Sequence, residues 1–426
     1  MAKPLLISGC AELVTLRGSA PRRGRQLADL GIIRDGALLV RNGRIAAVGR
    51  RQDVLRDTSA RRVAILDLGG RVVLPGFVDS HTHLVFAASR TEEYEKRISG
   101  ASYEEIERAG GGILSSVKKL RAASHDDLRD RAIAALRRFA EHGATTIEAK
   151  SGYGLDAKSE LATLRLHREL ASSQPLGIVS TFLGAHVVPP EFRKRRNGRE
   201  EYVEFLCRKL IPQIASEGLA DFCDVFCDRG AFTVAQARKV LTAARACGMG
   251  VRIHADQLTR TAAARLAVEL HAASADHLEE IIASDIRALA RSDTVATLLP
   301  GCRFHLGLPQ KAPARKLIEA GAIVALATDY NPGTSPTLSM SMILSLACNH
   351  LRMSPAEAIA AATINAAYSL RKHATIGSLE VGKYADLAVF DVADHREIPY
   401  YFGVNLCVLT MKRGNLIHAR AGAGLR

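Results

Sequence analysis

Tryptophan is absent from the chain, and aromatic residues make up only 5% of its 426 positions. A hydrophobic core must therefore be built mainly from aliphatic side chains, and a chain of this length can bury a large one. No segment approaches the roughly 20 apolar residues that a membrane-spanning helix needs. The N-terminal segment also lacks the long apolar stretch of a signal peptide. We therefore expect a soluble, cytoplasmic protein.

Paired cysteines are also missing. The eight cysteines are scattered, and none forms a Cys-x-x-Cys pair, which argues against a zinc ribbon and against a disulfide framework. Cys223 and Cys227 are best explained as strand and strand-end residues of a reduced cytosolic protein. Cys302 lies near an expected strand and has no evident base partner, so packing in the core or in a loop is its expected role.

Acidic residues are fewer than basic ones, with 44 Asp and Glu against 58 Lys and Arg and a formal net charge of +14. Much of the excess lies near the N-terminus, where the arginines are spread among hairpin-like turns rather than along one helix. No pattern of stacking aromatics accompanies them. A solvated basic surface is therefore favoured, and we expect neither a nucleic-acid partner nor a membrane partner. At most the charge favours the approach of anionic substrates.

Both ends of the chain show the pattern of β-structure. Residues 36–49 contain two apolar runs joined through Asn42-Gly43, a strong signal of a hairpin. A similar texture returns over residues 377–391. Two β-rich ends around a different middle predict one small β-sandwich domain assembled from residues 1–70 and 377–426.

Residues 71–376 repeat a different pattern, in which a helical stretch ends near a glycine and a short apolar strand follows. The glycines are Gly143, Gly248 and Gly321. Glycine is common just past a helix C-terminus because it accepts the left-handed backbone conformation. Helix–strand alternation over about 300 residues fits a parallel (β/α)8 barrel of the TIM type. The predicted fold class is therefore α/β, a (β/α)8 barrel with a small β-domain formed by both termini.

The most informative segment is Asp79-Ser80-His81-Thr82-His83, which directly follows the apolar run 72–78. Successive side chains of a strand point to opposite faces, so His81 and His83 project from the same side. Two imidazoles on one face at the end of a strand form half of a divalent metal site. Taken alone, the pair is equally compatible with an ordinary strand–loop junction.

Other expected strands also end in polar residues, and in a (β/α)8 barrel functional side chains collect at the C-terminal ends of the strands. The residues at these ends are His254, His277 and Asp329. Each alone is more often a satisfied polar strand end, but several at the same end of one barrel are improbable by chance. Three histidines and one aspartate can therefore converge on one metal ion, with His277 beside it.

With these residues in place, the chain resembles the amidohydrolase superfamily, whose signature matches residues 75–83. Within the superfamily it is similar, over nearly its whole length, to the enzymes that open 4-imidazolone-5-propanoate in histidine degradation. The more specific matches are residues 150–154 and 183–186. The resemblance implies one bound metal ion, zinc or iron, with the ligands His81, His83, His254 and Asp329. It places around the substrate Arg90, Tyr153, His186, Asn331, Gly333 and Thr334.

The reaction that the resemblance implies is metal-dependent hydrolysis of the cyclic amide of 4-imidazolone-5-propanoate to N-formimidoyl-L-glutamate. Asp329 would accept a proton from water and return it to the leaving ring nitrogen, while His277 would polarise the carbonyl or stabilise the oxyanion. Arg90 suits the propanoate because a guanidinium binds a carboxylate through two hydrogen bonds. Gln257 has no titrating carboxylate. It should therefore bind or orient the substrate, which leaves Asp329 or His277 as the base.

Lys150 raises the alternative of a second ion, since a strand-end lysine can bridge two metals as a carbamate. Its position, beside a Ser-Gly-Tyr-Gly loop, favours a substrate-side or structural role and hence a single ion. Two other classes of function share part of this pattern. An aminohydrolase of a purine, pyrimidine or related heterocycle would share the metal set without needing Arg90. A barrel that serves only in binding or assembly would be expected to have lost some metal-ligating residues, and none of the expected ones is missing. The resemblance also makes a homodimer a reasonable expectation.

Overall fold

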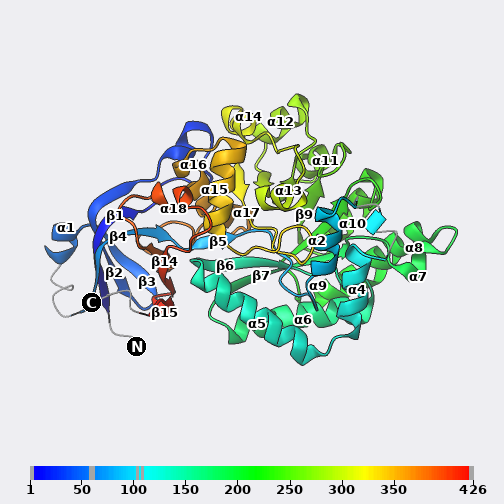
Figure 1. Ribbon diagram of the computed structural model, residues 1–426, viewed down its shortest axis with the longest axis horizontal. Helices are drawn as coiled ribbons and strands as arrows, with labels where there is room; N and C mark the ends of the chain where they lie inside the picture. The colour runs from blue at the N-terminus through cyan, green and yellow to red at the C-terminus, as the bar shows by residue number, and fades with distance from the viewer. Residues whose placement is uncertain (1–3, 57–62, 102–104, 107–109, 422–426) are drawn as a thin grey trace.

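The computed structural model of the protein describes residues 4–56, 63–101, 105–106 and 110–421. Within them the chain forms a seven-stranded sheet from its two ends and an eight-stranded sheet from its middle. Figure 1 shows the seven-stranded sheet on one side of the molecule and the eight-stranded sheet, surrounded by helices, on the other. The predicted α/β class and the predicted use of both chain ends in one β-structure are confirmed.

The terminal sheet is mixed and has the strand order β15-β14-β13-β4-β1-β2-β3. Its strands are β1 (Leu5–Val14), β2 (Ile32–Arg41), β3 (Arg44–Arg50), β4 (Ala64–Pro75), β13 (Leu387–Phe390), β14 (Cys407–Lys412) and β15 (Asn415–Ala419). Strand β4 pairs in parallel with β1 and antiparallel with β13. It therefore joins the strands of the N-terminal segment to those of the C-terminal segment.

The hairpin between β2 and β3 turns at the predicted place. Asn42 and Gly43 have φ angles of 50° and 75°. A two-residue turn of type I′ needs positive φ at both central positions, and Asn-Gly tolerates this best. The turn thus fixes the register of the first hairpin of the terminal sheet.

The middle of the chain forms a parallel sheet whose strands follow one another in sequence order. They are β5 (Phe77–Asp79), β6 (Ala144–Lys150), β7 (Gly177–Ala185), β8 (Phe222–Cys227), β9 (Gly250–Ala255), β10 (Ser274–His277), β11 (Val295–Leu298) and β12 (Val324–Leu326). The outer strands meet just beyond their ends. The His83 amide donates to the Tyr330 carbonyl at 2.8 Å, and the Asp329 amide donates to the His81 carbonyl at 3.0 Å. These bonds close the sheet into the predicted barrel.

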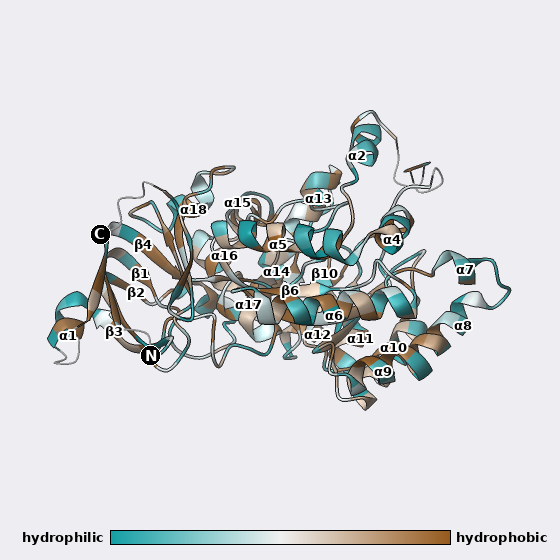
Figure 2. Cartoon of the chain, turned by 90° about the horizontal axis from the view of Figure 1, so that it is seen from below, coloured by the Kyte–Doolittle hydropathy of each residue, from teal (hydrophilic) through white to brown (hydrophobic). Residues whose placement is uncertain are grey.

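Helices connect the strands and cover the outside of the barrel (Figure 1). The helical elements are η1 (Gly24–Ala28), α1 (Arg51–Arg56), α2 (Thr91–Ile98), α4 (Ile113–Ala122), α5 (His125–Glu141), α6 (Ala157–Ser173), α7 (Pro190–Arg193), α8 (Gly198–Phe205), η3 (Leu206–Leu210), α9 (Ile211–Ser216), α10 (Val234–Ala246), α11 (Ala263–Glu269), α12 (Ala283–Ala290), α13 (Pro300–Leu306), α14 (Ala314–Glu319), α15 (Met340–Leu351), α16 (Pro355–Ala361), α17 (Ile364–Ser369) and α18 (Glu397–Tyr400). Figure 2 shows hydrophilic and hydrophobic residues on the same helices, for example α5 and α6. This is the pattern of helices that bury one face against a barrel. No helix of the described residues is long and apolar enough to cross a membrane.

Glycine ends three of these helices where the sequence predicts it. Gly143, Gly248 and Gly321 have φ angles of 85°, 82° and 87°. A side chain at such a position is strained, whereas glycine adopts the left-handed conformation freely. Each glycine lets the chain turn directly from a covering helix into the next barrel strand.

The terminal sheet packs on the barrel through one of its two faces. Leu74 and Phe390 belong to the core that it shares with the barrel, whereas the adjacent Val73 and Val389 belong to a second core within the terminal sheet. This division follows from the alternation of side chains along a strand. Phe390 also contacts Phe77 of β5, with ring centroids 5.7 Å apart. The terminal sheet thereby supports the strand that leads into His81 and His83.

Candidate metal centre and active site

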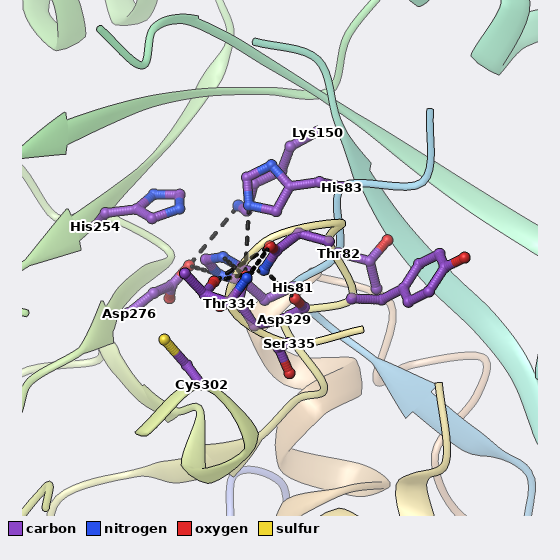
Figure 3. A network of polar contacts seen from close by, with 12 residues as sticks. His81, Thr82, His83, Lys150, His254, Asp276, Cys302, Asp329, Thr334 and Ser335 are labelled. Atoms are coloured by element: carbon purple, nitrogen blue, oxygen red, sulfur yellow. Dashed lines mark hydrogen bonds and ion pairs between the residues drawn. The ribbon is translucent and has the colours of Figure 1, made fainter. Parts of the chain in front are cut away.

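Four histidines and one aspartate meet at the C-terminal ends of the barrel strands. Figure 3 shows His81, His83, His254 and Asp329 of this cluster. His81 and His83 follow β5, His254 lies in β9, His277 ends β10, and Asp329 follows β12. All five side chains belong to residues that are at most 4% exposed. The His81 ring centroid lies 4.5 Å from that of His254 and 5.5 Å from those of His83 and His277. The four residues expected to ligate one ion are therefore together, with His277 beside them.

The donor atoms of this cluster are close enough to share a cation. Asp329 Oδ1 lies 3.5 Å from Nε2 of both His81 and His83. Ligand atoms of these three residues lie within 4.8 Å of one another, and so do those of His81, His254 and His277. The buried His81 Nε2 and His83 Nδ1 atoms have no hydrogen-bond partner among the described residues. Imidazole and carboxylate donors suit zinc or iron. The cluster therefore fits a divalent cation.

Burial keeps His81, His83 and His277 neutral. Burial, the largest cause, lowers the pKa of His81, His83 and His277 well below the usual histidine value, and neighbouring histidines lower it further. Neutral imidazoles keep the lone pair that a metal ion needs. Burial raises the pKa of Asp329 to about 7, although His254 opposes the increase. Such a carboxylate can gain or lose a proton near neutral pH.

The imidazoles of His81 and His254 each have a buried carboxylate next to Nδ1. Asp276 Oδ2 lies 2.7 Å from His81 Nδ1, and Asp224 Oδ2 lies 3.1 Å from His254 Nδ1. A carboxylate beside one ring nitrogen selects the tautomer in which the other nitrogen presents its lone pair. Asp276 and Asp224 therefore orient two histidines without being ligands themselves.

A charged network inside the barrel holds these carboxylates. The Lys150 ammonium donates to Glu148 and Asp224, both at 2.7 Å, and lies 3.8 Å from Asp276. Arg252 adds a second positive charge, 3.5 Å from Asp276 and 3.6 Å from Glu148. Burial would lower the pKa of Lys150, but Asp224 and Glu148 outweigh it and the pKa is raised. The charged Lys150 side chain thus binds carboxylates of the barrel. This supports a structural role for Lys150 over a role beside the substrate.

Strand ends at this site adopt an unusual backbone. The φ angles of Asp256, His277 and Asp329 are 51°, 82° and 54°. Non-glycine residues rarely adopt this region, which costs of order 1–3 kcal/mol each and tends to occur at functional sites. Asp256 shows how such a conformation is held, because its carboxylate accepts hydrogen bonds from the backbone amides of Thr261, Ala262 and Ala264. The side chain of Asp256 therefore has a structural role.

Arg90 packs directly on the backbone of the loop that follows β12. A Cβ atom at Gly333 would lie 1.5 Å from Arg90 Nη2, so a larger residue there would displace the guanidinium. Arg90 is buried, its Nη1 lies 3.5 Å from Glu93 Oε2, and its Nε has no hydrogen-bond partner among the described residues. In the same loop, Asn331 Oδ1 accepts from the amides of Gly333 and Thr334 at 2.8 Å and 2.7 Å. Asn331 therefore shapes the loop on which Arg90 rests.

Tyr153 and His186 lie beside His83. Their ring centroids are 5.8 Å and 5.5 Å from that of His83, and the His186 ring is stacked on it. His186 Nδ1 lies 3.0 Å from the Gly152 carbonyl oxygen. Because a carbonyl can only accept, Nδ1 carries the proton and Nε2 is left as an acceptor. An aromatic side chain and an oriented imidazole thus border the cluster.

The loop that carries Tyr153 is pinned by one buried glutamate. Glu160 Oε1 accepts hydrogen bonds from the amides of Gly152, Gly154 and Leu155 at 3.1 Å, 2.8 Å and 2.9 Å. The Tyr202 hydroxyl donates to the Leu155 carbonyl at 3.1 Å. These bonds explain why the Ser-Gly-Tyr-Gly segment has one defined conformation beside the metal cluster.

Gln257 lies beside a buried cysteine. Its Nε2 donates to Cys302 Sγ at 3.5 Å, and its backbone carbonyl accepts from Arg303. The Sγ atom, a ring nitrogen of His277 and a carboxylate oxygen of Asp329 lie within 4.8 Å of one another. Burial raises the pKa of Cys302 well above its usual value, so the thiol is protonated. Cys302, expected only to pack, therefore forms part of the wall of the site.

Sequence analysis did not identify the residues that support the cluster: Glu148, Asp224, Arg252 and Asp276. All four are completely buried in barrel strands. A signal was present, since each is a charged residue within a segment expected to form a barrel strand. Buried charges are rarely tolerated without partners, so four of them in neighbouring strands indicate a shared network.

Comparison with known proteins agrees with this architecture. The model of the amidohydrolase family matches residues 72–417. Solved structures with this fold include an adenosine deaminase from Xanthomonas campestris with bound zinc (TM-score 0.70, 18% identity, 97% of this chain and 93% of that one). A triazine hydrolase variant is also similar (TM-score 0.74, 18% identity, 98% of this chain and 96% of that one). At these identities the likeness shows the fold alone. By the family match, together with the barrel and its buried cluster, the chain belongs to the amidohydrolase family.

Relatives of much higher identity narrow the assignment. The imidazolonepropionase of Symbiobacterium thermophilum is 48% identical over 415 residues, which cover 97% of each chain. That of Geobacillus kaustophilus is 45% identical over 419 residues, 97% of this chain and 98% of the relative. Within the amidohydrolases, the chain is a member of the imidazolonepropionase family.

Proposed function

We propose that the protein hydrolyses the cyclic amide of 4-imidazolone-5-propanoate to N-formimidoyl-L-glutamate, as a cytoplasmic enzyme of histidine degradation. The observation that carries the proposal is identity of 45–48% with two imidazolonepropionases over 97% of the chain. The placement of a buried guanidinium on the loop that follows Asp329 supports it, because the substrate carries a carboxylate tail.

One zinc or iron ion is proposed for the cluster. Its ligands would be His81, His83, His254 and Asp329, which lie together at the ends of the barrel strands. An ion of this kind polarises a carbonyl and makes a water molecule more acidic. The buried charges of Lys150 and Arg252, already balanced by carboxylates, favour one ion over a pair bridged by a lysine carbamate.

Asp329 and His277 are the residues to which we assign the proton transfers and the stabilisation of charge. The attacking water oxygen bonds to the ring carbonyl carbon while Asp329 accepts a proton from that water. The bond from this carbon to the ring nitrogen then breaks, and Asp329 returns the proton to the nitrogen. Asp329 suits both transfers because its buried carboxylate lies beside the histidines that would hold the ion. His277 stabilises the negative charge that develops on the carbonyl oxygen.

Binding of the substrate is assigned to the residues that border the cluster. Arg90 would pair with the propanoate, and its unpartnered Nε is available for this. Tyr153 and His186 would hold the ring, with His186 Nε2 accepting a ring N–H. Gln257 would orient the substrate from the Cys302 side. The residues Asn331, Gly333 and Thr334 would act by shaping the loop beneath Arg90.

The domain limits also remain a proposal, with a β-domain from residues 1–70 and 377–426 around a barrel of residues 71–376. Strand β4 continues through Pro75 before β5 begins at Phe77, so one extended segment links the two parts. Such continuity would let the terminal sheet hold the first barrel strand in place.

The reaction can be tested by identifying the product. Purified protein is incubated with 4-imidazolone-5-propanoate in isotope-labelled water, and the products are analysed by mass spectrometry. The proposal predicts N-formimidoyl-L-glutamate with one labelled oxygen in its new carboxylate. An imidazolone that lacks the propanoate tail is the control and should react much more slowly. Inactivity with both, together with release of ammonia from a purine or pyrimidine, would move the protein to the aminohydrolases.

A further inference from the structure

Three donors beside the proposed ion site form a group of their own. Cys302 lies in the first turn of α13, directly after β11, while His277 ends β10 and Asp329 follows β12. Their ligand atoms lie within 4.8 Å of one another, and all three residues are buried. Figure 3 shows the Cys302 sulfur close to the histidine–aspartate cluster. These three residues form the Cys302 cluster.

The Cys302 cluster shares one residue, Asp329, with the proposed ion site. One oxygen of that carboxylate, Oδ1, lies 3.5 Å from Nε2 of both His81 and His83. A carboxylate has two oxygens and about four lone-pair positions, so it can serve two cations. Carboxylates commonly bridge metal ions about 3.5–4 Å apart. Geometry therefore allows a second cation next to the first.

The surroundings of His277 leave it able to bind. Its Nδ1 atom has no hydrogen-bond partner among the described residues and lies 4.0 Å from Glu279 Oε2. Arg303, whose Nε lies 3.5 Å from Glu279 Oε1, holds that glutamate in place. The His277 imidazole therefore keeps a buried ring nitrogen without a hydrogen-bond partner among the described residues.

We propose that His277, Cys302 and Asp329 form a second, weaker cation site that takes a thiophilic divalent ion such as Zn²⁺ or Cd²⁺. A thiol gives up its proton when it coordinates such an ion, so burial of the neutral thiol is no obstacle. Thiolate and imidazole favour these ions over Mg²⁺ or Ca²⁺. Three protein donors leave positions open for water. An ion here would engage His277 and displace Gln257 from the sulfur.

This site has a functional consequence that rests on the proposed function. If His277 stabilises the developing oxyanion, a cation bound to it removes that group from catalysis. Zinc in excess of one equivalent should then inhibit turnover. The occupancy of the site can be measured without any substrate, so failure of the proposed reaction and failure of this inference remain distinguishable.

Stepwise titration of the full-length protein with Co²⁺ tests the inference. The first equivalent should give visible absorption without a thiolate signal, because the first site holds only histidine and aspartate. The second equivalent should add the near-ultraviolet charge-transfer absorption of a thiolate–Co²⁺ bond. Equilibrium dialysis should show two bound Zn²⁺ ions per chain at saturation.

Two variants and one matched control complete the experiment. Cys302→Ser should lose the charge-transfer absorption and bind one Zn²⁺, and His277→Asn should also bind one. The control is Cys407→Ser, since Cys407 is equally buried but lies in β14 of the terminal sheet. It should behave as the wild type. Thermal unfolding of each variant shows whether it is folded under the conditions of the titration.

The possible outcomes separate clearly. Absence of a charge-transfer band at excess Co²⁺, with one Zn²⁺ bound by wild type and Cys302→Ser alike, would overturn the inference. A band that appears in full with the first equivalent would also overturn it, because Cys302 would then ligate the first ion. Inhibition by excess zinc that disappears in Cys302→Ser would support it further.

Discussion

The Nδ1 atom of His81 lies 2.7 Å from Oδ2 of Asp276, and both side chains are fully buried. Asp276 in turn lies within 4 Å of the positive charges of Lys150 and Arg252. The orientation of His81, a proposed metal ligand, therefore depends on Asp276, which is not a ligand. The position of Asp276 depends in turn on the charges of Lys150 and Arg252.

Replacing Asp276 with Asn should weaken metal binding. The amide keeps the shape of the side chain but no longer favours the tautomer in which His81 Nε2 carries the lone pair. Loss of such an outer carboxylate typically costs 10–100-fold in affinity, and competition with a chelator measures it. The control is Asp285→Asn, since Asp285 is a completely buried aspartate of α12 that accepts a hydrogen bond from Arg265 Nε at 2.8 Å. It should lower stability and leave metal affinity unchanged; equal affinities of the two variants would contradict the prediction.

Replacing Lys150 with Met should lower both stability and metal affinity. The buried carboxylates of Glu148 and Asp224 would lose their nearest positive charge, and breaking a buried ion pair costs about 3–5 kcal/mol. Lys412 offers a matched control, because its buried ammonium donates to Asp386 at 2.6 Å and to Thr146 Oγ1 at 3.1 Å, outside the metal cluster. Urea unfolding and chelator competition should show that Lys412→Met is also less stable but binds metal normally. A Lys150→Met protein with normal metal affinity would exclude the network from metal binding.

Moving the Arg90 guanidinium should raise the KM for the substrate. Arg90→Lys replaces a two-pronged contact with a point charge, and hydrogen bonds to charged groups contribute about 1.5–3 kcal/mol, so KM should rise about 10–100-fold. Gly333→Ala should have a similar effect, because its Cβ would lie 1.5 Å from Arg90 Nη2. Gly49→Ala, whose Cβ would lie 3.6 Å from Val54 Cγ2, is the control and should be silent. Steady-state kinetics measure KM, and an unchanged KM in both test variants would show that Arg90 does not bind the substrate.

Replacing His277 with Asn should separate metal binding from turnover. Asparagine tolerates the φ of 82° at this position better than most residues. We expect one equivalent of metal to be retained and kcat to fall by about 100-fold or more, the usual effect of losing a group that stabilises an oxyanion. Metal analysis and kinetics on one preparation measure both quantities. Full activity would exclude His277 from catalysis.

The residues that sequence analysis placed correctly are those with a local signature. Asn42-Gly43 makes a hairpin turn, and Gly143 ends a helix because of its backbone freedom. His81 and His83 lie together as expected, although β5 ends at Asp79 and both follow the strand. Each of these inferences needs only a few neighbouring residues. They were sufficient for the barrel, the terminal sheet and the residues of the candidate metal cluster.

The residues that it missed act over long distances along the chain. Lys150 contacts Asp224, 74 residues away, and His81 contacts Asp276, 195 residues away. Which charged residue meets which depends on how adjacent barrel strands are staggered, and no local pattern determines that. Cys302 was missed for the same reason, because its neighbours come from β10 and from the loop after β12.

A buried histidine outside the site should make stability depend on pH. Burial lowers the pKa of His167 from 6.5 to about 3, so as the pH falls the unfolded chain takes up the proton first. Above pH 6.5 His167 is neutral in both the folded and the unfolded chain and does not affect the pH dependence. As the pH falls from 6.5 toward about 3, only the unfolded chain gains this proton, so the free energy of unfolding decreases. Between about pH 7.5 and about pH 5, the free energy of unfolding should fall about 2 kcal/mol more in the wild type than in His167→Asn. Urea unfolding at the two pH values measures this, and parallel losses would contradict it.

The most direct test of the account follows the ultraviolet absorbance of 4-imidazolone-5-propanoate with purified protein before chelation, after chelation and after return of one equivalent of zinc or iron. The account predicts rapid loss of absorbance with formation of N-formimidoyl-L-glutamate, little activity after chelation, and recovery with the added ion. If protein carrying a full equivalent of metal left the substrate unchanged, the barrel and its buried cluster would stand but the proposed substrate would be wrong.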